Sequence, residues 1–229
     1  MKKEGILSSN QLKVIALIAM TLDHLGVQIF CDVLILRIIG RIAFPVFAYM
    51  ISEGCRFTKN RRKYLLGIFF IASLCQMVYF IFLKSLYQCI FVTFTLAIIG
   101  IYIIDYAKNK RDTKYIALAF CYVFLIYLLA EILPDVLKNT DFYIDYGFFG
   151  ICLPMLIYFA NGKNQKLMML AVGLILLSLK FGGIQWFSLI SVIFIFLYNG
   201  KRGKMNMKYM FYIYYPLHLM VIYLISIII

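Results

Sequence analysis

The sequence predicts an all-α integral membrane protein, a polytopic bundle of about nine transmembrane helices. Of its 229 residues, 64% are hydrophobic and 14% are charged, whereas soluble domains are about 45–50% apolar. Apolar runs near twenty residues recur along the chain, and about twenty helical residues cross a hydrocarbon core of about 30 Å. The alternating runs of about ten residues that a transmembrane β-barrel needs do not occur.

Each apolar run is assigned to one helix. No internal repeat and no linker rich in Gly, Ser or Pro divides the chain, so residues 1–229 are expected to form a single transmembrane domain. The charged start is followed by a long apolar run without a small-residue cleavage site, so the first run should remain as a helix. The predicted helices cover residues 12–30, 34–54, 64–83, 87–107, 114–133, 142–160, 167–181, 184–198 and 207–229.

The connections between these helices alternate in charge. Most of the 23 basic residues lie before the first helix or after the second, fourth, sixth and eighth, whereas the other connections hold only Lys84, Lys138 and Lys180. Cytoplasmic loops of membrane proteins are enriched in Lys and Arg. We therefore expect a multi-pass protein of the cell membrane with a cytoplasmic N-terminus and an extracytoplasmic C-terminus.

The seventh and eighth runs are short enough to be read as one long helix. Basic residues flank the pair on both sides, at Lys163 and Lys166 before it and at Lys201 and Arg202 after it. Both flanks belong on the same side of the membrane, which requires an even number of crossings. Gly182 and Gly183 supply the turn between two helices.

The net charge of +13 does not indicate a nucleic-acid partner, because the basic residues lie in short clusters between apolar runs. The cluster at Arg61, Arg62 and Lys63 is interpreted first as an orientation signal that contacts anionic membrane lipids. Holding a phosphate-rich donor is its second interpretation. The six cysteines are scattered with no CxxC pair, which favours packing over metal binding, and no metal is expected.

Ionisable residues within apolar runs are the candidate site, because each costs about 2.5 kcal/mol or more at the bilayer centre unless it is paired or hydrated. They are Asp23 and His24 in the first helix, Arg37 and Arg41 in the second, and His218 in the ninth. At 1.5 Å per residue, His24 lies about 18 Å from the cytoplasmic end of its helix, His218 about 16 Å, and Arg41 about 10 Å below the outer end. All three fall in one layer.

Spacing assigns partners within this layer. Arg37 and Arg41 project from one helical face and suit a carboxylate, phosphate or oxyanion. Asp23 and His24 point about 100° apart, so Asp23 is assigned to an arginine and not to His24. Pro45 and Pro216 cannot donate to the carbonyls four residues earlier, which predicts kinks beside the polar groups.

Structural explanations stay open for each of these residues. An Asp23–Arg41 pair can simply lock two helices together, and a histidine such as His218 can be a hydrogen-bonded packing residue. Glu53, near the basic cluster, is interpreted as interfacial rather than catalytic.

Motifs across nearly the whole chain resemble the TraX family, named for a conjugation protein that acetylates pilin. No single motif identifies the family, but the set of motifs together is specific for it. The motifs are Asp23-His24-Leu25-Gly26, the stretch 36–48, Glu53-Gly54, the stretch 60–65, Asp145-Tyr146-Gly147-Phe148-Phe149-Gly150, the stretch 198–204, and Tyr214-Tyr215-Pro216-Leu217-His218.

The resemblance implies a membrane acyltransferase that moves an acyl group, expected to be acetyl, from cytoplasmic acetyl-CoA or another acyl-CoA. The acceptor would be an extracytoplasmic amine or hydroxyl on a protein N-terminus, a glycan or a lipid headgroup. His24 is the candidate base or acyl carrier, His218 its assistant and Asp23 the next candidate base, because neutral imidazole takes protons near pH 7.

Further residues are expected to contact the substrate and the donor. Arg37, Arg41, Asp145 and Tyr146 are expected to bind substrate, and Arg61, Arg62 and Lys63 to contact the donor. An arginine can stabilise the oxyanion of acyl transfer. The main alternative is a small proton-coupled transporter, which would also place His, Asp and Arg at the midplane. A noncatalytic scaffold explains the clustered ionisable residues less well.

Overall fold

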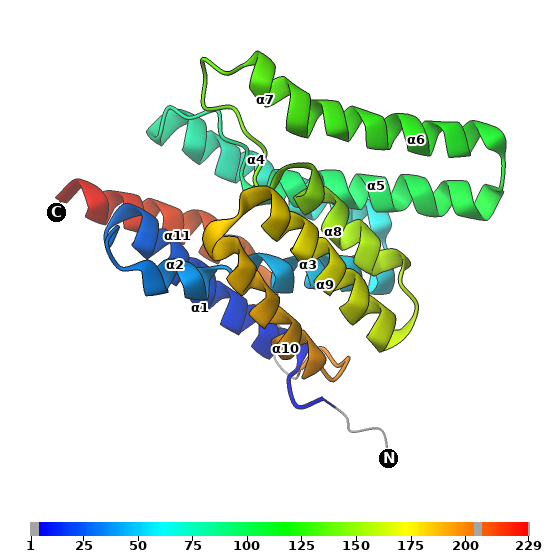
Figure 1. Cartoon of the computed structure of the whole chain (residues 1–229), viewed down its shortest axis with the longest axis horizontal. Coiled ribbons are helices and arrows are strands. Elements are labelled where there is room, and N and C mark those ends of the chain that lie inside the picture. The colour runs from blue at the N-terminus through cyan, green and yellow to red at the C-terminus, as the bar shows by residue number, and fades with distance from the viewer. Residues whose placement is uncertain (1–4, 204–207, 229) are drawn as a thin grey trace. The chain divides into compact units, whose positions relative to one another are not determined.

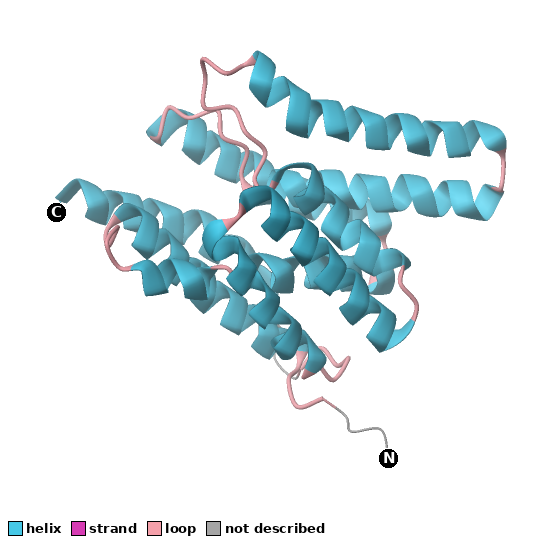
Figure 2. Cartoon of the chain, viewed as in Figure 1, coloured by secondary structure: helices cyan, strands magenta, loops and turns pink. Residues whose placement is uncertain are grey.

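The described part of the computed structural model covers residues 5–203 and 208–228, without the side chains of 208–212. Within these ranges the chain is helical, with two isolated β-bridges and no strand (Figure 2). Helical segments lie at each of the nine predicted positions, so the all-α prediction is confirmed.

Local capping explains why several helices begin or end away from the predicted residues. Helix α1 (Ser9–Gln28) starts early because Ser8 and Gln11 form a reciprocal capping box. Helix α4 (Arg61–Phe82) starts early because the Asn60 side chain accepts a hydrogen bond from the Lys63 amide. The prediction that a helix begins at residue 142 is wrong: α8 (Gly147–Phe159) begins after a turn in which Tyr146 and Gly147 have positive φ.

The chain divides into two compact units. The first comprises Met1–Met50 and Asn161–Ile229, and the second comprises Ile51–Ala160. The first boundary falls within α3 (Ala43–Phe57), so no linker marks it.

In the first unit, α1 packs closely against α2 (Leu34–Gly40) (Figure 1). A Cβ at Gly40 would collide with the Asp23 side chain, so the small residue permits this approach. The predicted helix 34–54 is interrupted at Arg41 and Ile42 before α3 begins, where a kink was predicted. Pro45, which cannot donate to the Arg41 carbonyl, explains the break.

The remaining helices of the first unit include a hairpin of α9 (Gly162–Phe181) with the 3₁₀ helix η2 (Gly183–Ile190) and α10 (Ser191–Phe196). Gly182 and Gly183 turn the chain with φ values of 63° and 50°. The Lys163 ammonium donates to the Tyr198 carbonyl over 3.1 Å. The two flanks therefore meet at one end of the unit, and the predicted turn at Gly182–Gly183 is confirmed.

Two further segments complete that unit. The Ser9 amide donates to the Lys201 carbonyl over 2.9 Å, which joins the start of α1 to the same end. The C-terminal helix α11 (Lys208–Ile228) runs through Pro216 without a break and packs against α1.

The second unit is built around α5 (Ile90–Lys110). Helix α5 contacts α4, α6 (Thr113–Tyr127) and α8, and Figure 1 shows α5 and α6 side by side, joined by a short turn. A π-helical turn, η1 (Leu128–Ile132), continues α6 into α7 (Leu133–Val136).

Hydrogen bonds tie the loops at one end of the second unit together. Leu86 donates its amide to the Asp141 carboxylate over 2.8 Å, and Gln88 donates to the Tyr143 carbonyl over 2.8 Å. We call this pairing of residues 84–88 with 140–145 the loop clamp. At the other end Arg61 pairs with Asp105, and Arg56 donates to the Tyr158 and Ala160 carbonyls.

Five helices in the described ranges are long and apolar enough to cross a membrane: Leu34–Phe57, Arg61–Phe82, Ile90–Lys110, Thr113–Val136 and Gly162–Phe181. The segments Gly147–Phe159, Gly183–Phe196 and Ile213–Ile228 are apolar but shorter. These helices support a membrane protein, while nine crossings and the sidedness of the termini stay predictions.

Candidate functional site

An ion-pair cluster joins α1 to the end of α2 in the first unit. Arg41 Nη2 lies 2.6 Å from both carboxylate oxygens of Asp23, and Arg37 Nη1 lies 3.6 Å from Asp23 Oδ1. The two arginines converge on one carboxylate, as their four-residue spacing predicted. One carboxylate facing two guanidinium groups leaves one positive charge in excess, which suits a second anion or a developing oxyanion.

The two histidines of the chain meet, although 194 positions separate them. His24 Nδ1 lies 2.8 Å from His218 Nε2, and the two rings are nearly coplanar, with 19° between their planes and their centroids 5.0 Å apart. The contact agrees with the prediction that the two histidines lie at the same depth. It joins α1 to α11 at a residue adjacent to Asp23.

Hydrogen-bond direction assigns the tautomers of this histidine pair. His218 Nδ1 lies 3.0 Å from the Tyr214 carbonyl, and a carbonyl only accepts, so Nδ1 carries the proton. In neutral His218 the Nε2 atom is then the acceptor, and His24 Nδ1 is the donor to it. The lone pair of His24 is thereby placed on Nε2, the atom a general base would use.

Aromatic side chains and one hydroxyl enclose the pair. The Tyr214 ring stacks on His218, and Tyr215 meets His218 edge to face at 5.1 Å. The Thr21 hydroxyl donates to the Leu17 carbonyl, so the Tyr214 hydroxyl, 2.7 Å away, donates to Thr21. These contacts restrain His218, which is 7% exposed.

Gln185, from η2, is a polar residue of this cluster that the sequence reasoning missed. Its Oε1 lies 3.5 Å from Arg41 Nη1, and the side chain is buried. Because a guanidinium only donates, the amide oxygen faces Arg41 and the Nε2 group faces away. Among the described residues this buried Nε2 has no hydrogen-bond partner. The only sequence signal was a lone amide within an apolar segment.

Asp145 and Tyr146 belong to the second unit and make contacts there. The Tyr87 hydroxyl donates to Asp145 Oδ1 over 2.6 Å, and the Thr93 hydroxyl donates to the Asp145 carbonyl over 2.7 Å. A Cβ at Gly150 would collide with Tyr146. These contacts explain the motif as a packed turn before α8, and a substrate-binding role for either residue stays a prediction.

Glu131 is the partner of that turn. Its Oε1 accepts a hydrogen bond from the Phe148 amide over 2.9 Å, at the N-terminus of α8. A carboxylate there satisfies an unpaired helix amide and the helix dipole.

The basic residues at the start of α4 are also in the second unit. Arg61 donates to Asp105 over 2.6 Å, whereas Arg62 and Lys63 are exposed. Glu53 is buried, with 8% of its surface exposed.

The described residues include no group of three His, Cys, Asp or Glu side chains that could hold a metal ion, and all six cysteines are free thiols.

Comparisons with known proteins cover most of the chain. The family model described as TraX protein matches residues 8–226. A probable fimbrial assembly protein FimC, serogroup H1, of Dichelobacter nodosus is 27% identical over 93% of each chain. An uncharacterized protein of Rickettsia prowazekii (strain Madrid E) is 31% identical over 68% of this chain and 57% of its own length. No solved structure matches significantly. On the extent of the family match, this chain belongs to the TraX family.

Proposed function

We propose that this protein is an acyltransferase of the cell membrane. It moves an acetyl group from cytoplasmic acetyl-CoA, or another acyl group from its acyl-CoA, to an amine or hydroxyl of an extracytoplasmic acceptor. The observation that carries the proposal is the His24–His218 hydrogen bond, which leaves the basic Nε2 atom of His24 directed away from the pair, on the residue that follows Asp23 of the ion-pair cluster.

Each atom of the transfer has a place in this scheme. His24 Nε2 takes the proton from the acceptor N–H or O–H as that nitrogen or oxygen attacks the thioester carbonyl carbon. The new C–N or C–O bond forms, the oxyanion collapses, and the C–S bond breaks. The proton on His24 passes to the leaving thiolate, which restores the neutral pair.

The arginine side chains are placed to stabilise the oxyanion that forms when the acceptor attacks the thioester. Arg37 is more exposed than Arg41, with 28% against 12% of its side-chain surface accessible, and its contact with Asp23 is longer. We assign oxyanion stabilisation to Arg37, while Asp23 holds Arg41 in place. The Nε2 group of Gln185, which faces away from Arg41 and has no partner among the described residues, is a further donor that a substrate carbonyl oxygen could use.

The comparisons suggest one class of acceptor. The Dichelobacter nodosus relative is described as a fimbrial assembly protein, so the N-terminal amine of a fimbrial subunit is the first acceptor to test. A glycan or a lipid headgroup is the alternative. Mass spectrometry of surface proteins, glycans and lipids with and without the gene would identify which of them loses an acyl group.

A proton-coupled carrier is the competing function, because two hydrogen-bonded imidazoles can also pass a proton. Purified protein in detergent should be stabilised against heat by acetyl-CoA and should release coenzyme A when an acceptor peptide is added. Substrate movement across a sealed vesicle without covalent change, together with no acetyl-CoA stabilisation, would replace the enzyme with the carrier.

A further inference from the structure

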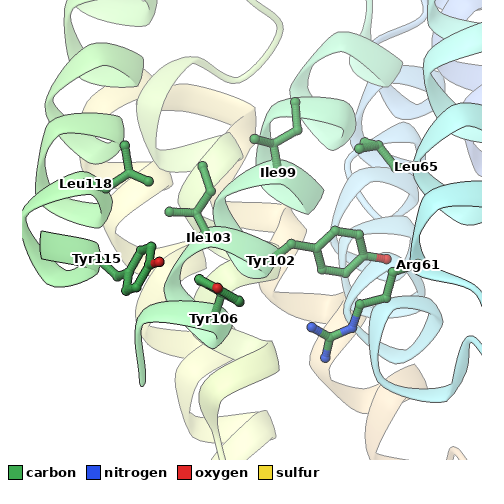
Figure 3. A pocket seen from close by; sticks show the side chains of 8 residues that line it. All are labelled: Arg61, Leu65, Ile99, Tyr102, Ile103, Tyr106, Tyr115 and Leu118. Atoms are coloured by element: carbon green, nitrogen blue, oxygen red, sulfur yellow. The ribbon is translucent and has the colours of Figure 1, made fainter. Parts of the chain in front are cut away.

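We propose that the second unit binds one anionic phospholipid of the surrounding membrane in a pocket between α4, α5 and α6. The pocket has a volume of about 410 Å³, and its lining side chains are shown in Figure 3. It is separate from the histidine site of the first unit in its residues. The proposal does not rest on the acyltransferase function.

One end of the pocket is polar. Arg61 lies with its guanidinium carbon 5.1 Å from the Tyr102 ring centroid, and Tyr106 meets Tyr115 edge to face at 4.9 Å. The Arg61 side chain is 49% exposed and pairs with Asp105 through Nη2. A guanidinium has five N–H donors, so one carboxylate does not exhaust it. Figure 3 shows the Arg61 guanidinium beside Tyr102 on the same side of the pocket as Tyr106.

The other end is apolar. Leu65 lies one helical turn after Arg61, and Leu118 lies about one turn after Tyr115. Ile99 precedes Tyr102 by three residues on α5. On α4 and α6 the lining therefore changes from polar to apolar with distance from the helix end, and on α5 the lining residue furthest from the end, Ile99, is apolar. A phospholipid at a membrane surface has the same order, with its headgroup at the helix ends and its acyl chain further in.

Charge around the polar end favours an anionic headgroup. The basic side chains Arg61, Arg62 and Lys63 begin α4, and the α5–α6 turn adds Lys108, Lys110, Arg111 and Lys114, against two acidic side chains, Asp105 and Asp112. Arg and Tyr together bind phosphate and the interfacial region of a bilayer. Acetyl-CoA also carries phosphates, but it has no long hydrocarbon chain for the apolar end.

Native mass spectrometry of the full chain in detergent tests this proposal, with phosphatidylglycerol and phosphatidylcholine of the same acyl chains. We expect phosphatidylglycerol to bind about fivefold to tenfold more tightly, since basic side chains at a membrane surface give effects of this order. Leu65→Trp, which fills the apolar end, should lose this preference. Leu66→Trp is the matched control, because Leu66 is 52% exposed and does not line the pocket.

Two charge variants should move binding in opposite directions. Arg61→Gln should weaken phosphatidylglycerol binding, whereas Asp105→Asn should strengthen it by removing the carboxylate that competes for Arg61. Arg62→Gln, next in sequence and outside the lining, should have a smaller effect than Arg61→Gln. Should Leu65→Trp fail to fold, Leu118→Trp with Ile116→Trp as its control replaces that pair.

Three results would overturn the proposal. They are equal affinity for the two lipids, equal loss in the Leu65→Trp and Leu66→Trp variants, and displacement of phosphatidylglycerol by an equal concentration of acetyl-CoA. The last result would assign the pocket to the acyl donor. Retained lipid binding with no acyltransferase activity would leave this proposal standing while removing the proposed function.

Discussion

The polar side chains of the candidate site in the first unit are oriented by their hydrogen-bond and ion-pair partners. The Tyr214 carbonyl sets the tautomer of His218, and His218 sets that of His24. Both carboxylate oxygens of Asp23 accept from Arg41, and Arg37 lies 3.6 Å from Oδ1. Asp23 is therefore better suited to positioning Arg41 than to taking a proton.

Removing either imidazole should abolish this arrangement without unfolding the helices. We expect His24→Ala to lose about 100-fold or more in turnover, the usual scale for a positioned acid–base group. His218→Ala should lose less, because His24 keeps its imidazole. Coenzyme A release by purified protein measures both, with Val27→Ala, an exposed α1 position, as the control. Near-normal turnover by His24→Ala would exclude it as the base.

Replacing Gln185 should change the stability of the protein and its turnover in different directions. A buried amide donor without a partner costs about 1–3 kcal/mol, so Gln185→Leu should leave the protein as stable as the wild type or more stable. Its turnover should nevertheless fall, because the unpartnered Nε2 donor and the amide oxygen that contacts Arg41 are both lost. Thermal unfolding and coenzyme A release are to be measured together, with Phe187→Leu on the same 3₁₀ helix as control. Loss of both properties in Gln185→Leu would indicate a packing role only.

At the scale of elements, the crossing of α1 and α2 depends on Gly40. The Asp23 side chain occupies the space that a Cβ at Gly40 would need. A second close approach lies at Gly26, where a Cβ would come within 2.9 Å of Leu36 Cβ. Small residues at such crossings allow helices to approach closely enough for an ion pair to form between them.

Gly40→Ala should therefore push the two helices apart. Overpacking of this kind costs about 1–3 kcal/mol, which should exceed the slight gain from placing Ala in a helix. Denaturant unfolding in detergent measures the loss, with Ile35→Ala, an exposed position on α2, as the comparison. An unchanged unfolding midpoint would mean that α1 does not approach α2 this closely.

The loop clamp of the second unit should respond to acid. The hydrogen bond from the Ser85 side chain has the largest effect on the Asp141 carboxyl and, together with the bond from the Leu86 amide, holds its pKa below the usual range. A lowered folded-state pKa means that the contribution to stability is present above the usual value of about 3.9 and fades as the pH falls through the folded-state pKa. The clamp should loosen only in strong acid.

Amide exchange provides the measurement. At neutral pH the Leu86 amide should exchange faster in Asp141→Asn than in the wild type, because the charged acceptor is gone. The difference should shrink as the pH falls through the folded-state pKa, where the wild-type carboxyl becomes neutral too. Comparing the two proteins at each pH cancels the intrinsic pH dependence of exchange. Equal protection at neutral pH would contradict the role assigned to Asp141.

At the scale of the whole molecule, the connections within each unit group as the charge pattern predicted. In the first unit the start of α1, the start of α9 and the end of α10 meet at one end. In the second unit the start of α4 meets the end of α5, and the loop clamp occupies the opposite end. Each grouping agrees with an even number of crossings between basic connections.

Single cysteines in a cysteine-free background test the resulting topology. Probes at Lys84, Lys138 and Lys180 should react with an impermeant reagent added outside the cell, because these connections are predicted to be extracytoplasmic. Probes at Lys59, Lys110 and Lys201 should react only after permeabilisation. Reaction of the Lys201 probe from outside would refute nine crossings.

The sequence by itself determined the membrane class, the approximate place of the helical segments and most residues of the candidate site. Apolar runs, caps and basic connections are local features, readable within a few residues. The tertiary structure decided which residues act together: His218 reaches His24, Gln185 reaches Arg41, and Asp145 is held by Tyr87. Depth along a helix follows from counting residues, but which helix faces which follows from packing between distant segments, and hydrogen-bond direction follows from that packing.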